Sequence, residues 1–318
     1  MRMQAHHIII DERAISFWDW ELKSKNIEFL KGIDPDYFNF IAHSNVSQLE
    51  TDNKHNAATA IRVAYSHATE TLFALIASSI QAPHCPLAWM LNYKNFELIN
   101  VIGKVVNREN LNTRFKNKNL TWHLLSETVH KHINPEKVDK NRIISGFENL
   151  WSKLAKEFID MNFSYEYNAI KHGLRVSPGG FKVVVCPEIS PGVADSPDKA
   201  IILGESAFGS SYFVNESIKG TPKHNFRPKR HGRNWDPIHL ANRLPFIAMS
   251  ISNILSWLCV INGEQPNSCK YHYPSDLNLF EEPWGNEVNL EHTTFDINIE
   301  SEDIYPISKK AIVKDYNK

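Results

Sequence analysis

Two long stretches of the chain carry mostly apolar side chains at helical spacing. Over residues 56–81 the apolar ones follow the i, i+3, i+4, i+7 pattern that lays one stripe along a helix. Over residues 139–172 two rows are spaced by seven, so both belong to one helix seam. The rows are Trp151, Phe158, Tyr165 and His172, and Leu154, Met161 and Asn168. We therefore expect two long helices packed through these stripes, in a mainly α fold built as a helical bundle.

The period of the pattern changes after Gly173. Short runs bounded by Pro and Gly, Phe181–Cys186 and Ala200–Leu203, are typical of strands. They predict a small antiparallel sheet or hairpin inserted at about residues 180–215. The expected organisation is a helical or irregular segment (1–55), a helical domain (56–263) and an acidic irregular tail (264–318).

Charge is unevenly distributed although the formal net charge is only -1. Residues 219–235, an expected loop, hold six Lys or Arg and no acid, whereas residues 276–303 hold nine Asp or Glu and no Lys or Arg. Two interpretations remain open. The loop could bind single-stranded nucleic acid, because Phe226 and Trp235 lie among its cations and rings stack on bases. Alternatively, it could be a solvated loop facing the acidic tail. The first interpretation assigns nucleic-acid binding to Lys229, Arg230 and Arg233.

The cysteines and the apolar runs of the sequence indicate the cellular compartment of the protein. None of the four cysteines forms a C-x-x-C pair. Scattered cysteines in a chain with a large core are typical of reduced thiols, so we expect a cytoplasmic protein. The longest apolar stretch, Leu244–Ile261, is interrupted by Pro245 and several polar residues, which predicts a buried helix and no membrane contact. Because metal-ligand and nucleotide-loop motifs such as H-E-x-x-H and G-x-G-x-x-G are missing, we expect no metal and no cofactor.

A polar pair, Asn168 and His172, ends the otherwise apolar seam. At i, i+4 the two side chains share a helix face. A buried polar group without a partner costs about 1–3 kcal/mol. Either both groups are therefore satisfied inside the core, or they open onto a functional site.

The run Tyr167-Asn168-x-x-Lys171-His172 resembles the R-N-x-x-x-H signature of the HEPN superfamily (higher eukaryotes and prokaryotes nucleotide-binding domain). Members of that family are helical bundles, and many are metal-independent ribonucleases of toxin, anti-phage and RNA-processing systems. The resemblance covers roughly residues 56–175. It implies a HEPN-like bundle that binds or cleaves RNA in a prokaryotic toxin or defence setting.

The resemblance also implies roles for single residues. His172 would be the acid or base, Asn168 would orient it or the substrate, and Lys171 and Arg175 would contact phosphate. One histidine cannot readily both take and give the proton, so a homodimer supplying a second copy would fit.

Tyr167 stands where the family has Arg, and this departure supports an alternative. A chain without that arginine could be a catalytically inactive HEPN-like interaction module with a partner protein. Whether the chain is an enzyme, a possible endoribonuclease, therefore stays open at this point.

The 56–81 stretch carries Arg62, Ser66 and Glu70 in one i, i+4 row, with His67 three residues before Glu70. Such a row is usually a salt-bridged face, either solvated or between helices. The functional interpretation is that Glu70 or His67 supports the site by orienting His172 from a facing helix.

Overall fold

The computed structural model describes residues 5–135, 138–281, 288, 290–295 and 305–317. Of these residues, 51% are helical and 17% lie in strands, which form four small sheets. The expectation of a mainly α bundle with one β insertion is therefore wrong, and the chain is mixed α/β. Strands that were not expected lie near the N-terminus and in the basic segment, where apolar and polar residues do not alternate clearly along the sequence.

The chain divides into two compact units, and each unit combines three separate segments. The sequence suggested three consecutive segments, whereas each unit is assembled from segments that are not consecutive. Two of the boundaries between the units fall inside helices, α3 (Lys54–Gln81) and α8 (Met161–Lys171). The helical unit comprises Met1–Gln48, Ala60–Ser164 and Ile238–Gly285. The sheet unit comprises Leu49–Thr59, Tyr165–Pro237 and Asn286–Lys318.

The helical unit contains most of the helices. Besides α3 they are α1 (Leu22–Lys31), α2 (Tyr37–Val46), α4 (Pro86–Asn92), α5 (Asn95–Val106), α6 (Trp122–Val129), α7 (Lys140–Phe158) and α9 (Pro237–Ile261). Short 3-10 helices cover His130–His132, Pro266–Ser268 and Leu277–Phe280. Only Tyr93 and Lys94 separate α4 from α5.

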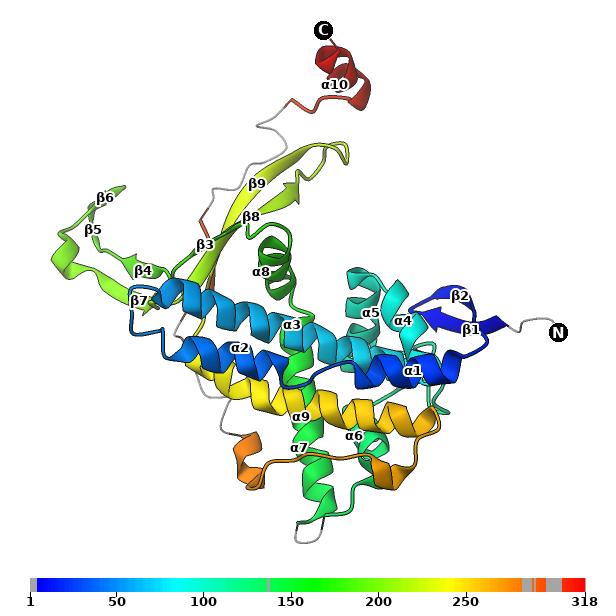
Figure 1. Cartoon of the computed structure of the whole chain (residues 1–318). Coiled ribbons are helices and arrows are strands. Elements are labelled where there is room, and N and C mark those ends of the chain that lie inside the picture. Colours follow the sequence, from blue (N-terminus) through cyan, green and yellow to red (C-terminus); the bar gives the residue numbers. More distant parts are fainter. Residues whose placement is uncertain (1–4, 136–137, 282–287, 289, 296–304, 318) are drawn as a thin grey trace. The chain divides into compact units, whose positions relative to one another are not determined.

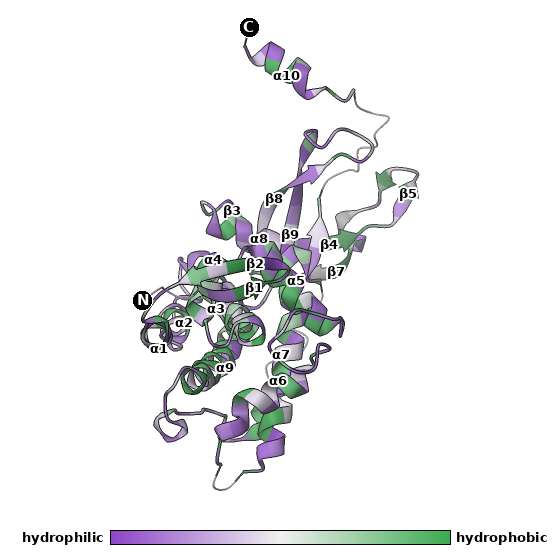
Figure 2. Ribbon diagram, turned by 90° about the vertical axis from the view of Figure 1, so that its right-hand side faces the viewer, coloured by the Kyte–Doolittle hydropathy of each residue, from purple (hydrophilic) through white to green (hydrophobic). Residues whose placement is uncertain are grey.

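The core of the helical unit lies where α7 crosses α3 and α9. Figures 1 and 2 show α1, α2, α3 and α9 running alongside one another with α7 across them. Phe73 of α3 packs on Phe158 of α7 at 5.0 Å between ring centroids. Trp151 of α7 donates its indole N–H to Ser250 Oγ of α9 at 2.9 Å. The apolar stripe predicted for α3 is confirmed as a buried contact surface.

Helix α9 is long and apolar enough, by length and composition, to cross a membrane. Figure 2 colours much of it as hydrophobic. Yet 67% of its most apolar window is buried within the protein, as expected of a core helix.

The single helix expected over 139–172 is interrupted. α7 ends at Phe158 and α8 begins at Met161. Asp160 explains the restart, because its carboxylate accepts the N–H of Asn162 at 3.0 Å, as an N-cap does. The two rows spaced by seven therefore do not continue along one seam, and the prediction of one unbroken helix is wrong.

A β-hairpin precedes α1 in the segment that was expected to be helical or irregular. β1 (Ala5–Ile10) pairs antiparallel with β2 (Arg13–Trp18). The run Ile8 to Ile10 hides the alternation, since Ile8 and Ile10 are buried and Ile9 is exposed. Asp11 makes the turn at φ 54° and its N–H donates to Gln81 Oε1 at the end of α3.

The sheet unit is built from short antiparallel strands around α8. Its largest sheet has the order β10-β9-β8-β3, and β4–β7 and β5–β6 form two ribbons. The strands are β3 (Val176–Pro178), β4 (Lys182–Val185), β5 (Glu188–Ser190), β6 (Val193–Ala194), β7 (Ile201–Glu205), β8 (Gly209–Ser217), β9 (Phe226–Asn234) and β10 (His292–Thr294). A 3-10 turn (Pro197–Lys199) and an exposed C-terminal helix α10 (Lys309–Tyr316) complete the described elements.

The basic segment expected to be a loop is largely strand β9. It pairs with β8 over its whole length, from Phe226 opposite Ser217 to Asn234 opposite Gly209. Pro228 is tolerated because its missing N–H points away from β8, to the same side as the Arg230 carbonyl, which accepts the Phe295 N–H. Cations, not apolar residues, alternate along β9, and this hid the strand from the sequence analysis.

Candidate nucleic-acid interface

The predicted site lies at the C-terminal end of α8, in the sheet unit. The His172 N–H still donates to the Asn168 carbonyl at 3.0 Å, so the two residues remain one helical turn apart. Gly173 follows at φ +96°, a conformation that glycine adopts without strain. The Arg175 N–H then turns back to the Ala169 carbonyl at 2.7 Å, which satisfies the helix end.

Burial separates these residues into two groups. Tyr167 is 3% exposed and Asn168 is half-buried, whereas Lys171, His172 and Arg175 are exposed. His172 is therefore not sealed in the core, which was one of the two open interpretations. Three exposed groups that are or can become cationic thus follow one another at the helix end.

Tyr167 occupies the position of the family's arginine as a buried ring. The ammonium of Lys171 lies 5.1 Å from the centre of that ring. A cation over an aromatic face is attracted by it. Lys171 is thus held against the end of α8.

A buried carboxylate, Glu166, anchors α8 to the sheet. It is fully buried and accepts hydrogen bonds from Ser210 Oγ at 2.6 Å and from the Trp235 indole N–H at 2.9 Å. Arg233 Nη1 lies 3.7 Å from its other oxygen. Glu166 was not among the residues predicted from the sequence. Its position next to Tyr167, in a helix expected to pack, was the one possible signal of its burial.

The three cations assigned to nucleic acid on the basic segment differ in what they contact. Arg233 is 3% exposed and pairs with Glu166 and, through Nη2, with Glu291. Lys229 is half-buried and pairs with Glu216 at 3.2 Å. Arg230 alone of the three is exposed, and its guanidinium lies 5.5 Å from the centre of the Phe295 ring. Arg233 and Lys229 thus have ion-pair partners within the sheet unit, and their assignment to nucleic-acid binding stays a prediction.

The segment is a strand and not a solvated loop, and among the described residues only the Arg233–Glu291 ion pair links it to the acidic region as the second interpretation expected. Glu216 accepts from Arg227 at 2.8 Å as well as from Lys229, and the hydrogen bond with Arg227 is the main reason that its pKa is lowered. Glu291, from the acidic region of the sequence, lies beside β9 as that interpretation expected. Most other acids of that region lie outside the described residues.

Two histidines that the sequence analysis did not single out meet on the same sheet. His231 Nδ1 of β9 lies 3.1 Å from His292 Nε2 of β10. Tyr212 stacks on His231 at 5.9 Å between ring centroids. One ring must donate and the other accept in this bond. Strand pairing between distant segments brings them together, so no local motif could reveal them.

The supporting residues Glu70 and His67 belong to the helical unit. Glu70 is buried and accepts from the Tyr93 hydroxyl at 3.2 Å, while His67 is half-buried. Arg62, in the same row, is 1% exposed and lies 3.6 Å from Glu157. The row is therefore an internal polar face of the helical unit and not a solvated one.

Among the described residues, no group of three or more His, Cys, Asp or Glu is placed to hold a metal ion. Comparison of the chain with protein-family models, with curated proteins and with solved structures finds no match.

Proposed function

We propose that the chain binds RNA at the end of α8 and cleaves it without a metal ion, with His172 as the proton-transferring group. The observation that carries this proposal is the exposure of His172 one turn after Asn168, between the exposed cations Lys171 and Arg175. The resemblance of this run to the R-N-x-x-x-H signature supports the same assignment.

The reaction suits these groups. His172 takes the proton from a ribose 2′-OH, whose oxygen attacks the adjacent phosphorus, and the bond to the 5′-oxygen breaks. The products are a 2′,3′-cyclic phosphate and a 5′-OH, so no external reactant is needed. Lys171 and Arg175 would stabilise the charge that builds on the phosphate oxygens. A second copy of the chain could supply the histidine that protonates the leaving oxygen, in a cytoplasmic toxin or defence setting.

The test compares the wild-type chain with His172→Ala on total RNA in EDTA. Wild type should cut RNA, leave 2′,3′-cyclic phosphate ends and spare DNA, and His172→Ala should not cut. Because His172 is exposed, the substitution should change the free energy of unfolding by less than about 0.5 kcal/mol. His43→Ala, which removes an exposed histidine of the helical unit, is the matched control and should keep full activity. Cleavage that persists in His172→Ala would refute the assignment.

A catalytically inactive interaction module is the second candidate. It is favoured by Tyr167, a buried ring where the R-N-x-x-x-H signature has an arginine, and by the apolar ribbon β4–β7. Both faces of that ribbon are exposed, with Val184 at 47% and Val185 at 50%. Wild-type protein that neither binds nor cuts RNA would favour this candidate.

A further inference from the structure

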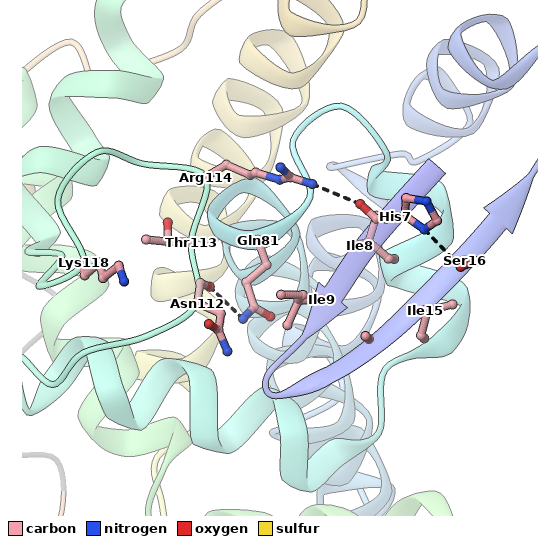
Figure 3. Close-up of a pocket in the computed structure, with 11 residues that line it drawn as sticks. His7, Ile8, Ile9, Ile15, Ser16, Gln81, Asn112, Thr113, Arg114 and Lys118 are labelled. Carbon is pink, nitrogen blue, oxygen red and sulfur yellow. Dashed lines mark hydrogen bonds between the residues drawn. The ribbon is translucent and has the colours of Figure 1, made fainter. Parts of the chain in front are cut away.

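A pocket of about 560 Å³ opens in the helical unit, away from every residue discussed above as a site. It lies between the β1–β2 hairpin, the last residue of α3 and the loop that follows α5 (Figure 3). This volume is in the range of small-molecule sites.

One wall of the pocket is cationic and polar. Arg114 and Lys118 come from the loop, and His7 and Ser16 come from facing positions of the hairpin. His7 Nδ1 and Ser16 Oγ are 3.0 Å apart. No Asp or Glu is among the residues that line the pocket in the described part of the chain. Such a wall favours an anion.

The loop that carries the cations is fixed in place. Arg114 donates from Nη2 to the His7 carbonyl at 3.0 Å, a bond that Figure 3 shows spanning loop and hairpin. The Arg114 N–H and the Thr113 hydroxyl both donate to the Ile80 carbonyl, at 2.9 and 3.0 Å. Gln81 Nε2, at the end of α3, donates to the Asn112 carbonyl of the loop at 2.9 Å. A guanidinium anchored at one nitrogen keeps its other donors in a defined direction, as a preorganised anion site needs.

Ile9 and Ala14 add apolar side chains to the hairpin side of the pocket, and the ring of Trp18 lies farther along the same strand, beyond Ser16 and outside the pocket lining. Ile9 and Ala14 face each other across the strands, and the register places Ser16 and then Trp18 farther along the same face. Trp18 is 59% exposed, which is unusual for so large an apolar ring. A flat apolar group held by this face would lie beside the anion bound by the loop.

We propose that this pocket binds a phosphate monoester joined to a planar ring, with the chemistry of a nucleoside monophosphate. Arg114 and Lys118 hold the phosphate, the His7 and Ser16 side chains hydrogen-bond to the sugar, and the ring lies beyond them on the same face of the hairpin, against Trp18. The same chemistry exists in a free mononucleotide and at the 5′-phosphate end of an RNA chain. The site is independent of the proposed cleavage at His172, which lies in the sheet unit.

Calorimetric titration with AMP, inorganic phosphate and adenosine tests the proposal on the full chain. AMP should bind, and phosphate and adenosine should each bind at least tenfold more weakly. A 5′-phosphorylated trinucleotide that binds as tightly as AMP would identify RNA ends as the source, whereas one that binds at least tenfold more weakly would identify the free nucleotide.

Variants locate the binding. Lys118→Gln should weaken AMP binding about tenfold, and the side chain of Lys118 makes no recorded hydrogen bond or ion pair in the described structure whose loss could unfold the loop. Trp18→Ala should weaken AMP but not phosphate. Lys116→Gln, an exposed cation of the same loop outside the pocket, should leave AMP binding within twofold. His172→Ala should also bind AMP normally, which separates this site from the RNA site. No AMP binding at millimolar concentration, or equal weakening by Lys116→Gln and Lys118→Gln, would overturn the proposal.

Discussion

Buried charges and rings in the helical unit are held by partners that lie far away in the sequence. Glu157 of α7 accepts from the Tyr65 hydroxyl at 2.6 Å and lies 3.6 Å from both Arg62 and Arg243. Desolvation, and then the Glu157 charge, raise the pKa of Tyr65, so this hydroxyl stays protonated and donates. Each of these residues is polar in the sequence, and only the packing of α3, α7 and α9 shows that they form one group.

His130 is another buried polar residue of the helical unit, and it is stacked on Phe147 at 4.5 Å between ring centroids. Its Nδ1–H donates to the Ser126 carbonyl at 2.8 Å, and its Nε2 accepts from Asn253 at 3.1 Å. Both nitrogens are thus satisfied in the neutral form. Desolvation by burial lowers the pKa of His130 to about 4.

This pKa predicts acid sensitivity. In the unfolded chain His130 titrates near its ordinary value of 6.5, so between pH 6.5 and 4 the unfolded state binds more protons. The stabilising contribution is complete above pH 6.5 and is lost as pH falls to 4, by about 3 kcal/mol. Urea unfolding from pH 7 to pH 4 should show this loss, and His130→Gln should show a flatter dependence over the same window. Parallel curves for the two proteins would contradict the prediction.

At the scale of elements, apolar periodicity predicted the elements that bury an apolar face, and it missed the strand whose inward side chains are charged. The stripe on α3 was predictable because a helix buried along its length repeats apolar residues every three or four positions. β9 was not, because its inward residues Arg227, Lys229 and Arg233 are neutralised by acids from other segments. The end of α8 was predictable as a helix end from Gly173, and the exposure of His172 was not, since it depends on which face of α8 the sheet covers.

The restart at Asp160 gives a prediction at this scale. Asp160 accepts the Asn162 N–H with its carboxylate and the Ser164 N–H with its carbonyl, so its side chain stabilises the first turn of α8. Asp160→Ala should lower the free energy of unfolding by about 1 kcal/mol. Asp160→Asn keeps the accepting oxygen and should recover most of that loss. Chemical unfolding of the three proteins checks this, and an unchanged midpoint for Asp160→Ala would show that the cap does not matter.

At the scale of the whole molecule, the expected acidic tail (264–318) is divided between the units, and its described residues 290–295 belong to the sheet unit and include the strand β10. β10 pairs with β9, opposite the strand β8. The Asn234 N–H donates to the Glu291 carbonyl at 2.7 Å, and the Glu291 carboxylate pairs with the buried Arg233. The Asn234 side chain in turn bonds the Phe181 and Leu290 carbonyls. A strand near the end of the chain thus completes a sheet that begins more than a hundred residues earlier.

A chain ending at residue 285 should therefore lose stability in the sheet unit. It lacks β10 and leaves Arg233 with Glu166 as its remaining recorded carboxylate, and each lost hydrogen bond contributes about 1 kcal/mol. Amides of β9 should exchange with deuterium faster, while amides of α3 and α9 in the helical unit should keep their protection. A chain ending at residue 308 is the matched control, because it removes α10, all of whose described residues are exposed, and keeps both β10 and the Ile307 bonds to His224 and Asn225. Equal exchange of β9 in the two shortened chains would show that β10 does not hold the sheet together.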